Sequence, residues 1–390
     1  MLKGTFPIGR FESLKTPFYF YDMGLLRETL LEIGRQTERY PGFKVHYAIK
    51  ANFNPQILKE IAASGLGADC VSGGEISQAF EAGFAPEGIV FAGVGKTDED
   101  IRLGLSLGIA RFNVESVAEL EVIDSLAGEM GTVAPVSIRV NPDIGAHTHA
   151  NITTGLAENK FGIFHEQVEG VLRQILGMKH VRYCGLHFHI GSQILDMADF
   201  VALCNRVNGI TARLRRHGLP VGDINVGGGL GINYQHPNHL PIADFEGYFG
   251  TFARHLELTP GQEVHFELGR SVVAPCGTLI SRVLYVKEGL TRKFAVLDAG
   301  MNDLIRPALY HAFHRIENLS SDEPEELYDV VGPICESSDV FGKSLSIDRC
   351  RRGDFIAIRS AGAYGESMAS CYNSRPLAGA VCWGESFEGK

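Results

Sequence analysis

Residues 45–71, VHYAIKANFNPQILKEIAASGLGADCV, carry the pattern that decides the fold. A short apolar run at 45–49 precedes a helical pattern at 55–64, which Gly65 ends, and a second apolar run follows at 68–71. Short apolar runs bounded by turn residues are typical of buried strands, and apolar residues at helical spacing between them indicate a helix. This stretch therefore predicts a strand–helix–strand unit.

The same alternation continues along the chain, with a unit of roughly 21 to 25 residues up to position 140 and wider spacing beyond it. Further strands are expected at 89–92, 110–114, 136–140, 181–189, 223–226 and 264–268, and helices at 23–40, 75–82, 98–106, 117–127, 166–176, 200–217 and 245–255. Eight strand–helix units predict a TIM-type (β/α)8 barrel, and a doubly wound open sheet is the less favoured alternative.

The pattern changes after residue 270, where short apolar runs are separated by Gly, Pro and Asp. Such runs predict an all-β domain, a β-sandwich or β-barrel, with strands at 279–285, 294–299, 327–331, 354–358 and 379–383. The aromatic run at 16–22 precedes the barrel and could join that domain as a strand. We therefore expect an α/β plus β protein, with a barrel at 22–268 and a β domain made of 1–21 and 269–390.

The composition restricts the class of protein. The chain carries 36 basic and 46 acidic side chains, a net charge of −10, which argues against nucleic acid and anionic membranes as partners. No window is apolar enough for a membrane span, and the N-terminus lacks the apolar stretch of a signal peptide, so a cytoplasmic location is expected. The eight cysteines are too sparse for a disulfide scaffold, and they form no Cys-x-x-Cys pair, so a structural zinc site is not expected either.

In such a barrel, functional side chains lie at the C-terminal ends of the strands. The first strand delivers Lys50, whose amine would become nucleophilic if buried, although a solvated lysine fits the position equally well. The glycines at 227–231 and the segment 269–271 follow the last two strands, where barrels commonly bind phosphate. His187 and His189 share one side of the sixth strand, but a metal pair is weakly supported because other strand ends lack matching ligands.

A reactive lysine, a histidine able to stack and a phosphate cradle at one barrel mouth together indicate pyridoxal phosphate as cofactor, without a metal. Lys50 would form a Schiff base with the aldehyde, and the glycine loops would hold the phosphate. Glu267 would keep the pyridine nitrogen protonated, so that the ring can act as an electron sink. His147 and His149 fall in a polar loop and add no matching ligand set.

From Thr16 to Trp383 the sequence resembles the fold-type III pyridoxal-phosphate decarboxylases, and within them the group that acts on diaminopimelate. The motifs that carry the resemblance are 47–52 (YAIKAN), 159–162 (NKFG), 188–193 (FHIGSQ), 227–231 (GGGLG), 267–270 (ELGR), 301–310 (MNDLIRPALY), 332–339 (GPICESSD) and 362–365 (GAYG). Two positions depart from the family pattern: Leu268 replaces a usual Pro, and Cys371 replaces a usual Asn.

The resemblance implies a role for each motif. Lys50 would be the Schiff-base lysine and Cys335 the general acid, while His189 would stack on the cofactor ring and Glu267 would hold the pyridine nitrogen. The other cofactor contacts, around the phosphate, would be Ser192, Gly228, Gly229, Gly269, Arg270 and Tyr364. The distal end of the substrate would be bound by Arg270, Arg306, Tyr310, Glu336 and Tyr364.

The reaction that the resemblance implies is decarboxylation of meso-diaminopimelate to L-lysine and CO2, the last step of lysine biosynthesis. It also implies a homodimer in which Cys335 and Glu336 enter the site of the other subunit. The nearest alternative is a decarboxylase of the same fold acting on L-ornithine, L-lysine or carboxynorspermidine. An amino-acid racemase is disfavoured by Glu267, because racemases of this barrel type usually place an arginine at the pyridine nitrogen. A non-catalytic binding protein is disfavoured by the presence of Lys50 and Cys335.

Overall fold

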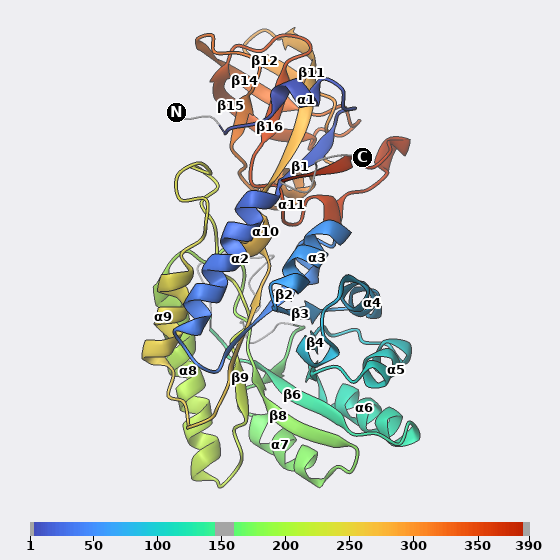
Figure 1. Ribbon diagram of the computed structural model, residues 1–390, viewed down its shortest axis with the longest axis vertical. Helices are drawn as coiled ribbons and strands as arrows, with labels where there is room; N and C mark the ends of the chain where they lie inside the picture. The colour runs from blue at the N-terminus through green and yellow to red at the C-terminus, as the bar shows by residue number, and fades with distance from the viewer. Residues whose placement is uncertain (1–3, 145–159, 385–390) are drawn as a thin grey trace. The chain divides into compact units, whose positions relative to one another are not determined.

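The computed structural model describes residues 4–144 and 160–384. The chain forms two compact units, which we call the barrel unit and the β unit (Figure 1). The barrel unit comprises Leu30–Gly231 and Asp244–Gly269, and the β unit comprises Met1–Thr29, Ile232–Ala243 and Arg270–Lys390. The β unit is thus assembled from stretches that lie far apart in the sequence, whereas only the segment Ile232–Ala243 interrupts the barrel unit.

The barrel unit is a closed ring of eight parallel strands. Around the ring they are β2 (Phe43–Ala48), β3 (Gly67–Cys70), β4 (Ile89–Phe91), β5 (Arg111–Val114), β6 (Ala134–Asn141), β8 (Val181–His187), β9 (Asp223–Asn225) and β10 (Val264–Leu268). The β5–β6 and β10–β2 pairings close the ring, and β7 (Ile163–Phe164) adds to β6. The predicted TIM-type barrel is therefore confirmed, and the open-sheet alternative is wrong.

Helices lie outside these strands (Figure 1). They are α2 (Met23–Glu38), α3 (Pro55–Ala63), α4 (Gly73–Ala82), α5 (Asp98–Leu107), α6 (Val117–Glu129), α7 (Val168–Gly177), α8 (Met197–Arg216) and α9 (Phe245–His255). The helices α3 to α6 each begin after a residue whose side-chain oxygen accepts a hydrogen bond from a backbone N–H of the first turn: Asn54, Ser72, Thr97 and Ser116. Each such cap stabilises a helix start by about 1 kcal/mol and places the start close behind the preceding strand.

The alternation of side chains along β10 separates the two sides of the barrel wall. The ring of Phe266 packs on three aromatic rings of α9, Tyr248, Phe249 and Phe252, with centroid distances of 4.9 to 5.7 Å. Because successive residues of a strand point to opposite faces, His265 and Glu267 point into the barrel. Both are buried. The wall is thus apolar toward the helices and carries polar side chains inside.

The β unit holds a second sheet of eight strands, most of them antiparallel. They are β1 (Phe18–Asp22), β11 (Gly277–Glu288), β12 (Lys293–Leu297), β13 (Ile316–Asn318), β14 (Glu325–Val331), β15 (Val340–Asp348), β16 (Phe355–Ile358) and β17 (Gly379–Trp383). The N-terminal strand β1 pairs antiparallel with β11 and parallel with β17. A core of buried side chains holds these strands together: Phe11, Phe18, Phe20, Ile280, Phe355 and Ala357. The expected β domain with the N-terminal strand is confirmed.

Short helical segments complete the described chain. They are α1 (Ile8–Phe11), α10 (Arg270–Val273), α11 (Arg306–Tyr310) and the 3-10 turns Ile49–Ala51, Pro86–Gly88, Glu366–Met368 and Tyr372–Ser374. Among the helices that the structure describes, none combines the length and the apolar character that a membrane span requires.

Candidate active site

Glu267, at the end of β10, is the centre of a buried hydrogen-bond network inside the barrel. Its Oε1 accepts hydrogen bonds from Asn225 Nδ2 (2.7 Å) and Asn113 Nδ2 (3.2 Å), and its Oε2 lies 3.0 Å from His187 Nε2. These three partners come from β9, β5 and β8. Burial alone would raise the pKa of Glu267, but the contact with His187 and the charge of Lys50 together outweigh it and hold the pKa well below the usual range. The buried carboxylate is therefore ionised.

Lys50 lies at the same end of the barrel as Glu267. It follows β2 directly, and β2 pairs with β10 in a register that places Tyr47 opposite Leu268. The Lys50 Nζ lies 3.0 Å from Asp69 Oδ2 on β3. Burial raises the pKa of Asp69, the charge of Glu267 adds to the effect, and the Lys50 ammonium opposes it. The amine is thus anchored to a buried carboxylate.

His189 extends the chain beyond β8 toward the glycine loop. Its Nδ1 accepts a hydrogen bond from the backbone N–H of Gly228 at 3.3 Å. Burial lowers the pKa of His189 to about 3, and the positive charges of Arg139 and Lys50 act in the same direction. The ring is therefore neutral at physiological pH, with its single proton on Nε2.

The glycine loop is packed so closely that side chains are excluded from it. A Cβ atom on Gly228 would lie 1.9 Å from the carbonyl oxygen of Glu267. Gly229 has a φ of +109°, and its Cβ would lie 2.8 Å from the carbonyl oxygen of Gly191. The loop is tied to the neighbouring segment by the backbone bonds of Ile194 with Gly229 (2.8 Å) and Gly231 (2.9 Å). Bare backbone at this strand end leaves room for a ligand group to approach closely.

Two further residues of the predicted cofactor set lie beside this loop. Ser192 is partly buried in the segment between His189 and Ile194, and Gly269 is buried directly after β10. The departure at Leu268 leaves β10 intact, since Leu268 continues the β10–β2 pairing.

Several residues of this network were not singled out from the sequence. Asp69, Asn113 and Asn225 are buried polar residues near the C-terminal ends of their strands, the positions where a barrel carries functional side chains. His187 and His189 share a side of the chain, yet His187 contacts Glu267 whereas His189 accepts from the glycine loop. The remaining residues of the sequence argument, His147, His149 and Asn159, lie outside the described residues.

The β unit contains a cluster of two buried arginines around one phenol, which we call the arginine cluster. Arg270 Nη1 and Arg306 Nη1 both donate to the hydroxyl oxygen of Tyr234, at 2.7 and 2.9 Å. Burial alone would raise the pKa of Tyr234, but the two guanidinium groups outweigh it and lower the pKa. Two cations converging on one oxygen make a site suited to a carboxylate or another anion.

Neighbouring side chains hold the arginine cluster in place. Arg306 Nη1 also donates to His314 Nε2 at 2.9 Å, and His314 Nδ1 donates to the carbonyl of Arg359 at 2.8 Å. Burial lowers the pKa of His314 to about 3, helped by the charge of Arg306, so His314 is neutral. The guanidinium of Arg270 lies 4.9 Å from the ring centroid of Tyr364. Tyr310, the last residue of α11, is partly buried.

A tight turn in the β unit presents Cys335 and Glu336, both of which are exposed. The buried carboxylate of Asp339 fixes the turn by accepting hydrogen bonds from the backbone N–H groups of Ile334 and Met301, each at 2.7 Å. Glu336 Oε1 accepts a hydrogen bond from the hydroxyl of Tyr372 at 2.6 Å.

The Cys335 backbone N–H donates to Asn373 Oδ1 at 3.2 Å. Cys371 is exposed nearby in sequence, and nothing in the structure explains why cysteine stands there. The turn thus displays a free thiol and a carboxylate together.

The chain is similar to known proteins along both units. Residues 30–274 match the family of the pyridoxal-dependent decarboxylase, pyridoxal binding domain. A diaminopimelate decarboxylase of Bacteroides thetaiotaomicron is 61% identical over 376 residues, which cover 96% of this chain and 97% of that protein. One from Zymomonas mobilis is 42% identical over 94% of this chain and 87% of its own length.

A solved structure shows the same likeness. The crystal structure of diaminopimelate decarboxylase from Helicobacter pylori complexed with L-lysine has a TM-score of 0.90 and 40% sequence identity. The match covers 97% of this chain and 94% of that chain. All three relatives match nearly the whole of this chain at 40% identity or more. Lys50, the glycine loop and Glu267 lie within the residues that match the family of the pyridoxal binding domain. The chain belongs to the diaminopimelate decarboxylase family of pyridoxal-dependent decarboxylases.

Proposed function

We propose that this protein decarboxylates meso-diaminopimelate to L-lysine and CO2, with pyridoxal phosphate as its cofactor. The observation that carries the proposal is the presence of an amine, Lys50, and an ionised carboxylate, Glu267, at the same end of the barrel. The identity of 61% with the Bacteroides enzyme and the L-lysine complex of the Helicobacter enzyme support this substrate.

The residues at this end of the barrel fit the cofactor. The glycine loop carries no side chain at Gly228 or Gly229, so its bare backbone can approach a phosphate closely. Asp69 Oδ1 is buried and lacks a hydrogen-bond partner within the described residues, so it can accept a bond from a ligand. When bound, pyridoxal phosphate supplies an electron sink for the electron pair left as CO2 departs.

Each barrel residue then has a separate task. Lys50 would hold the cofactor through its amine, which lies beside Asp69. Glu267 holds a proton at the pyridine nitrogen, because an ionised buried carboxylate stabilises a positive charge beside it. His189 packs on the ring face as a neutral imidazole. The phosphate is held by Ser192, Gly228, Gly229, Gly269, Arg270 and Tyr364.

The arginine cluster and the exposed turn serve the other end of the substrate. Diaminopimelate carries a second amino-acid end, which remains in the product as the amino-acid end of L-lysine. We assign the distal carboxylate to Arg270 and Arg306, because two converging guanidinium groups fit a carboxylate. Glu336 takes the distal ammonium, and the hydroxyls of Tyr310 and Tyr364 complete the contacts.

Cys335 is the proton donor of the proposed reaction. The bond between the α-carbon and the departing carboxylate breaks, and the proton of the Cys335 thiol is delivered to that carbon. The Cys335 thiol and Glu336 lie on an exposed turn that hydrogen bonds to Asp339 hold in shape. An exposed turn of fixed shape is suited to insert into the active site of a second copy of the chain. We therefore propose a homodimer in which each subunit lends Cys335 and Glu336 to the other.

The experiment measures CO2 release from meso-diaminopimelate, L-lysine and L-ornithine by the protein loaded with pyridoxal phosphate. We expect release from diaminopimelate alone, with stoichiometric L-lysine. Release from lysine or ornithine would keep the cofactor assignment and refute the roles of Arg270, Arg306 and Glu336. Racemised product without CO2 would refute the role of Glu267.

A further inference from the structure

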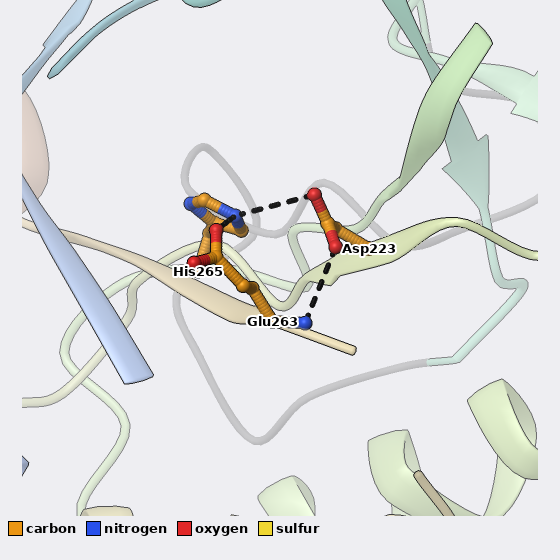
Figure 2. A group of neighbouring side chains, drawn as sticks. All are labelled: Asp223, Glu263 and His265. Carbon is orange, nitrogen blue, oxygen red and sulfur yellow. Dashed lines mark hydrogen bonds and ion pairs between the residues drawn. The ribbon is translucent and has the colours of Figure 1, made fainter. Parts of the chain in front are cut away.

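Three side chains gather at the opposite end of the barrel from Lys50, outside the proposed active site (Figure 2). Asp223 begins β9, Glu263 directly precedes β10, and His265 lies within β10. His265 Nε2 lies 3.4 Å from Glu263 Oε2 and 3.8 Å from Asp223 Oδ2. The pairing of His265 with Asn225 places Glu263 opposite Asp223 on the neighbouring strand. Two adjacent strands thus bring one imidazole and two carboxylates together.

A chain of hydrogen bonds decides which nitrogen of His265 carries its proton. His46 Nδ1 lies 2.9 Å from the carbonyl oxygen of Gly88, which can only accept, so His46 Nδ1 carries a proton. His46 is buried and takes part in none of the ion pairs among the described residues, so its ring is neutral and its Nε2 accepts. His265 Nδ1, at 2.9 Å from that nitrogen, must therefore donate.

The remaining nitrogen of a neutral His265 then carries a lone pair that lies beside two carboxylates. The His265 side chain is only 5% exposed, and its Nε2 is buried without a hydrogen-bond partner in the described part of the chain. A lone pair facing carboxylate oxygens is repulsive unless a cation lies between them. This unpartnered buried nitrogen is an observation separate from the acidic pair, and it points to a ligand.

We propose that Asp223, Glu263 and His265 bind a divalent transition-metal ion, and that zinc fits best. In tetrahedral coordination with metal–ligand bonds of about 2.1 Å, neighbouring ligand atoms lie about 3.4 Å apart, close to the observed separations. A metal-bound histidine usually donates its other N–H to an acceptor, as His265 does to His46. The Asp223 and Glu263 side chains are 27% and 40% exposed, which leaves a solvent-facing position for water.

Two nearby cationic side chains each contact one carboxylate of the site but leave oxygen lone pairs available for a metal ion. Arg111 Nη2 lies 3.3 Å from Asp223 Oδ2, and Lys44 Nζ lies 4.0 Å from Glu263 Oε1. A carboxylate oxygen has two lone pairs, so Asp223 Oδ2 can face both Arg111 and a metal, and Glu263 keeps Oε2 for it. The ion would clamp β9 to β10 at the end of the barrel where stabilising rather than catalytic residues are found.

The test uses the full chain loaded with pyridoxal phosphate, stripped with a chelator and dialysed against zinc. Wild type should bind one zinc per chain at this site, and its melting temperature should rise with zinc but not with magnesium. Glu263→Gln, which alters a partly exposed ligand, should weaken binding by on the order of tenfold or more. Glu257→Gln, which removes an exposed carboxylate outside the cluster, should bind as wild type.

Other histidines and thiols of the chain can also take zinc, and the paired variants separate these cases. Equal stoichiometry and affinity in Glu263→Gln and Glu257→Gln would overturn the proposal. A second result would also overturn the proposal: the wild type takes up no zinc, and Glu263→Gln changes the stability of the fold in acid. In that case a proton on His265 Nε2, rather than a metal ion, would lie between the imidazole and the two carboxylates. Asp223→Asn should repeat the loss seen with Glu263→Gln, and a failure to do so would also overturn it. Enzyme activity enters none of these readouts.

Discussion

The Nζ atom of Lys50 lies 3.0 Å from the Oδ2 atom of Asp69, although the Lys50 side chain is 42% exposed and the Asp69 side chain is fully buried. A carboxylate held out of water carries a desolvation cost that one ion pair to a partly exposed lysine does not remove. The second oxygen of Asp69 is buried without a hydrogen-bond partner among the residues described, which adds to that cost. The pair is thus arranged for chemistry rather than for stability.

Asp69→Asn should therefore stabilise the fold while lowering the rate of decarboxylation. Burial in the fold raises the pKa of Asp69, so the folded state holds this proton to a higher pH than the unfolded chain does. The free energy of unfolding therefore falls as the pH rises from the unfolded-state pKa of Asp69 through its folded-state pKa. At neutral pH, removing the charge should raise that free energy by on the order of 1 kcal/mol. CO2 release should fall by about tenfold or more. Urea unfolding and the decarboxylation assay check both, with Asp98→Asn as an exposed control; a less stable Asp69→Asn protein contradicts the argument.

Glu267→Gln should lower kcat by on the order of a hundredfold or more. A neutral amide cannot hold a proton at the pyridine nitrogen, and its NH2 group cannot accept from the three donors that now face Glu267. The variant should still take up cofactor, which its absorbance spectrum reports separately from activity. Wild-type kcat in a cofactor-loaded variant would show that Glu267 does not face the reacting ring.

Mild acid should destabilise the fold through His314. Its pKa is lowered to about 3, whereas the unfolded chain titrates near 6.5, so the unfolded state binds the proton first as pH falls. The stability that the neutral His314 gives to the fold is fully present above about pH 6.5 and is lost as the pH falls toward 3. Between pH 7 and pH 5 this one group should cost ~2 kcal/mol of unfolding free energy. Urea titrations at both pH values measure the loss, and His314→Gln, which can still accept from Arg306, should show a smaller difference between them.

Arg306→Ala should lower kcat/KM for diaminopimelate by on the order of a hundredfold, mainly through KM. The variant removes one of the two guanidinium groups that converge on the Tyr234 hydroxyl and leaves His314 without its donor. Lys343→Ala, an exposed cation of the same unit, is the matched control and should leave both constants unchanged. Unchanged kinetics in Arg306→Ala would mean that the distal carboxylate is bound elsewhere.

The barrel could be predicted because the signals that begin and end its strands and helices are local. Apolar runs of strand length, helix caps such as Ser72 and terminating glycines such as Gly83 recur at a regular spacing, and each acts within a few residues. Strands β13 and β15 were missed for the opposite reason. β13 has three residues, and much of β15 is exposed and polar, so neither shows an apolar run.

The contacts within the candidate site depend on long-range pairing that no local pattern encodes. Lys50 and Glu267 could be named because each ends an apolar strand. Asn113 donates to Glu267 across 154 positions of the sequence, a contact that exists only once the barrel has closed. Tyr234 likewise joins Arg270 and Arg306, which lie 36 and 72 positions away from it. Resemblance to a family supplied the arginines, but not the phenol between them.

Mixing two inactive variants should restore activity if the sites are shared between subunits. Lys50→Ala lacks the cofactor amine and Cys335→Ala lacks the proton donor, so each homodimer should be nearly inactive. In a hybrid dimer, one site receives both defects and the other receives neither. After random exchange of subunits half of the dimers are hybrids, so about a quarter of all sites are intact. Unfolding and refolding the two variants together should therefore give about a quarter of the wild-type activity, and refolding each alone should give none. A mixture that stays inactive, although wild type recovers under the same conditions, would place Lys50 and Cys335 of one site on the same subunit.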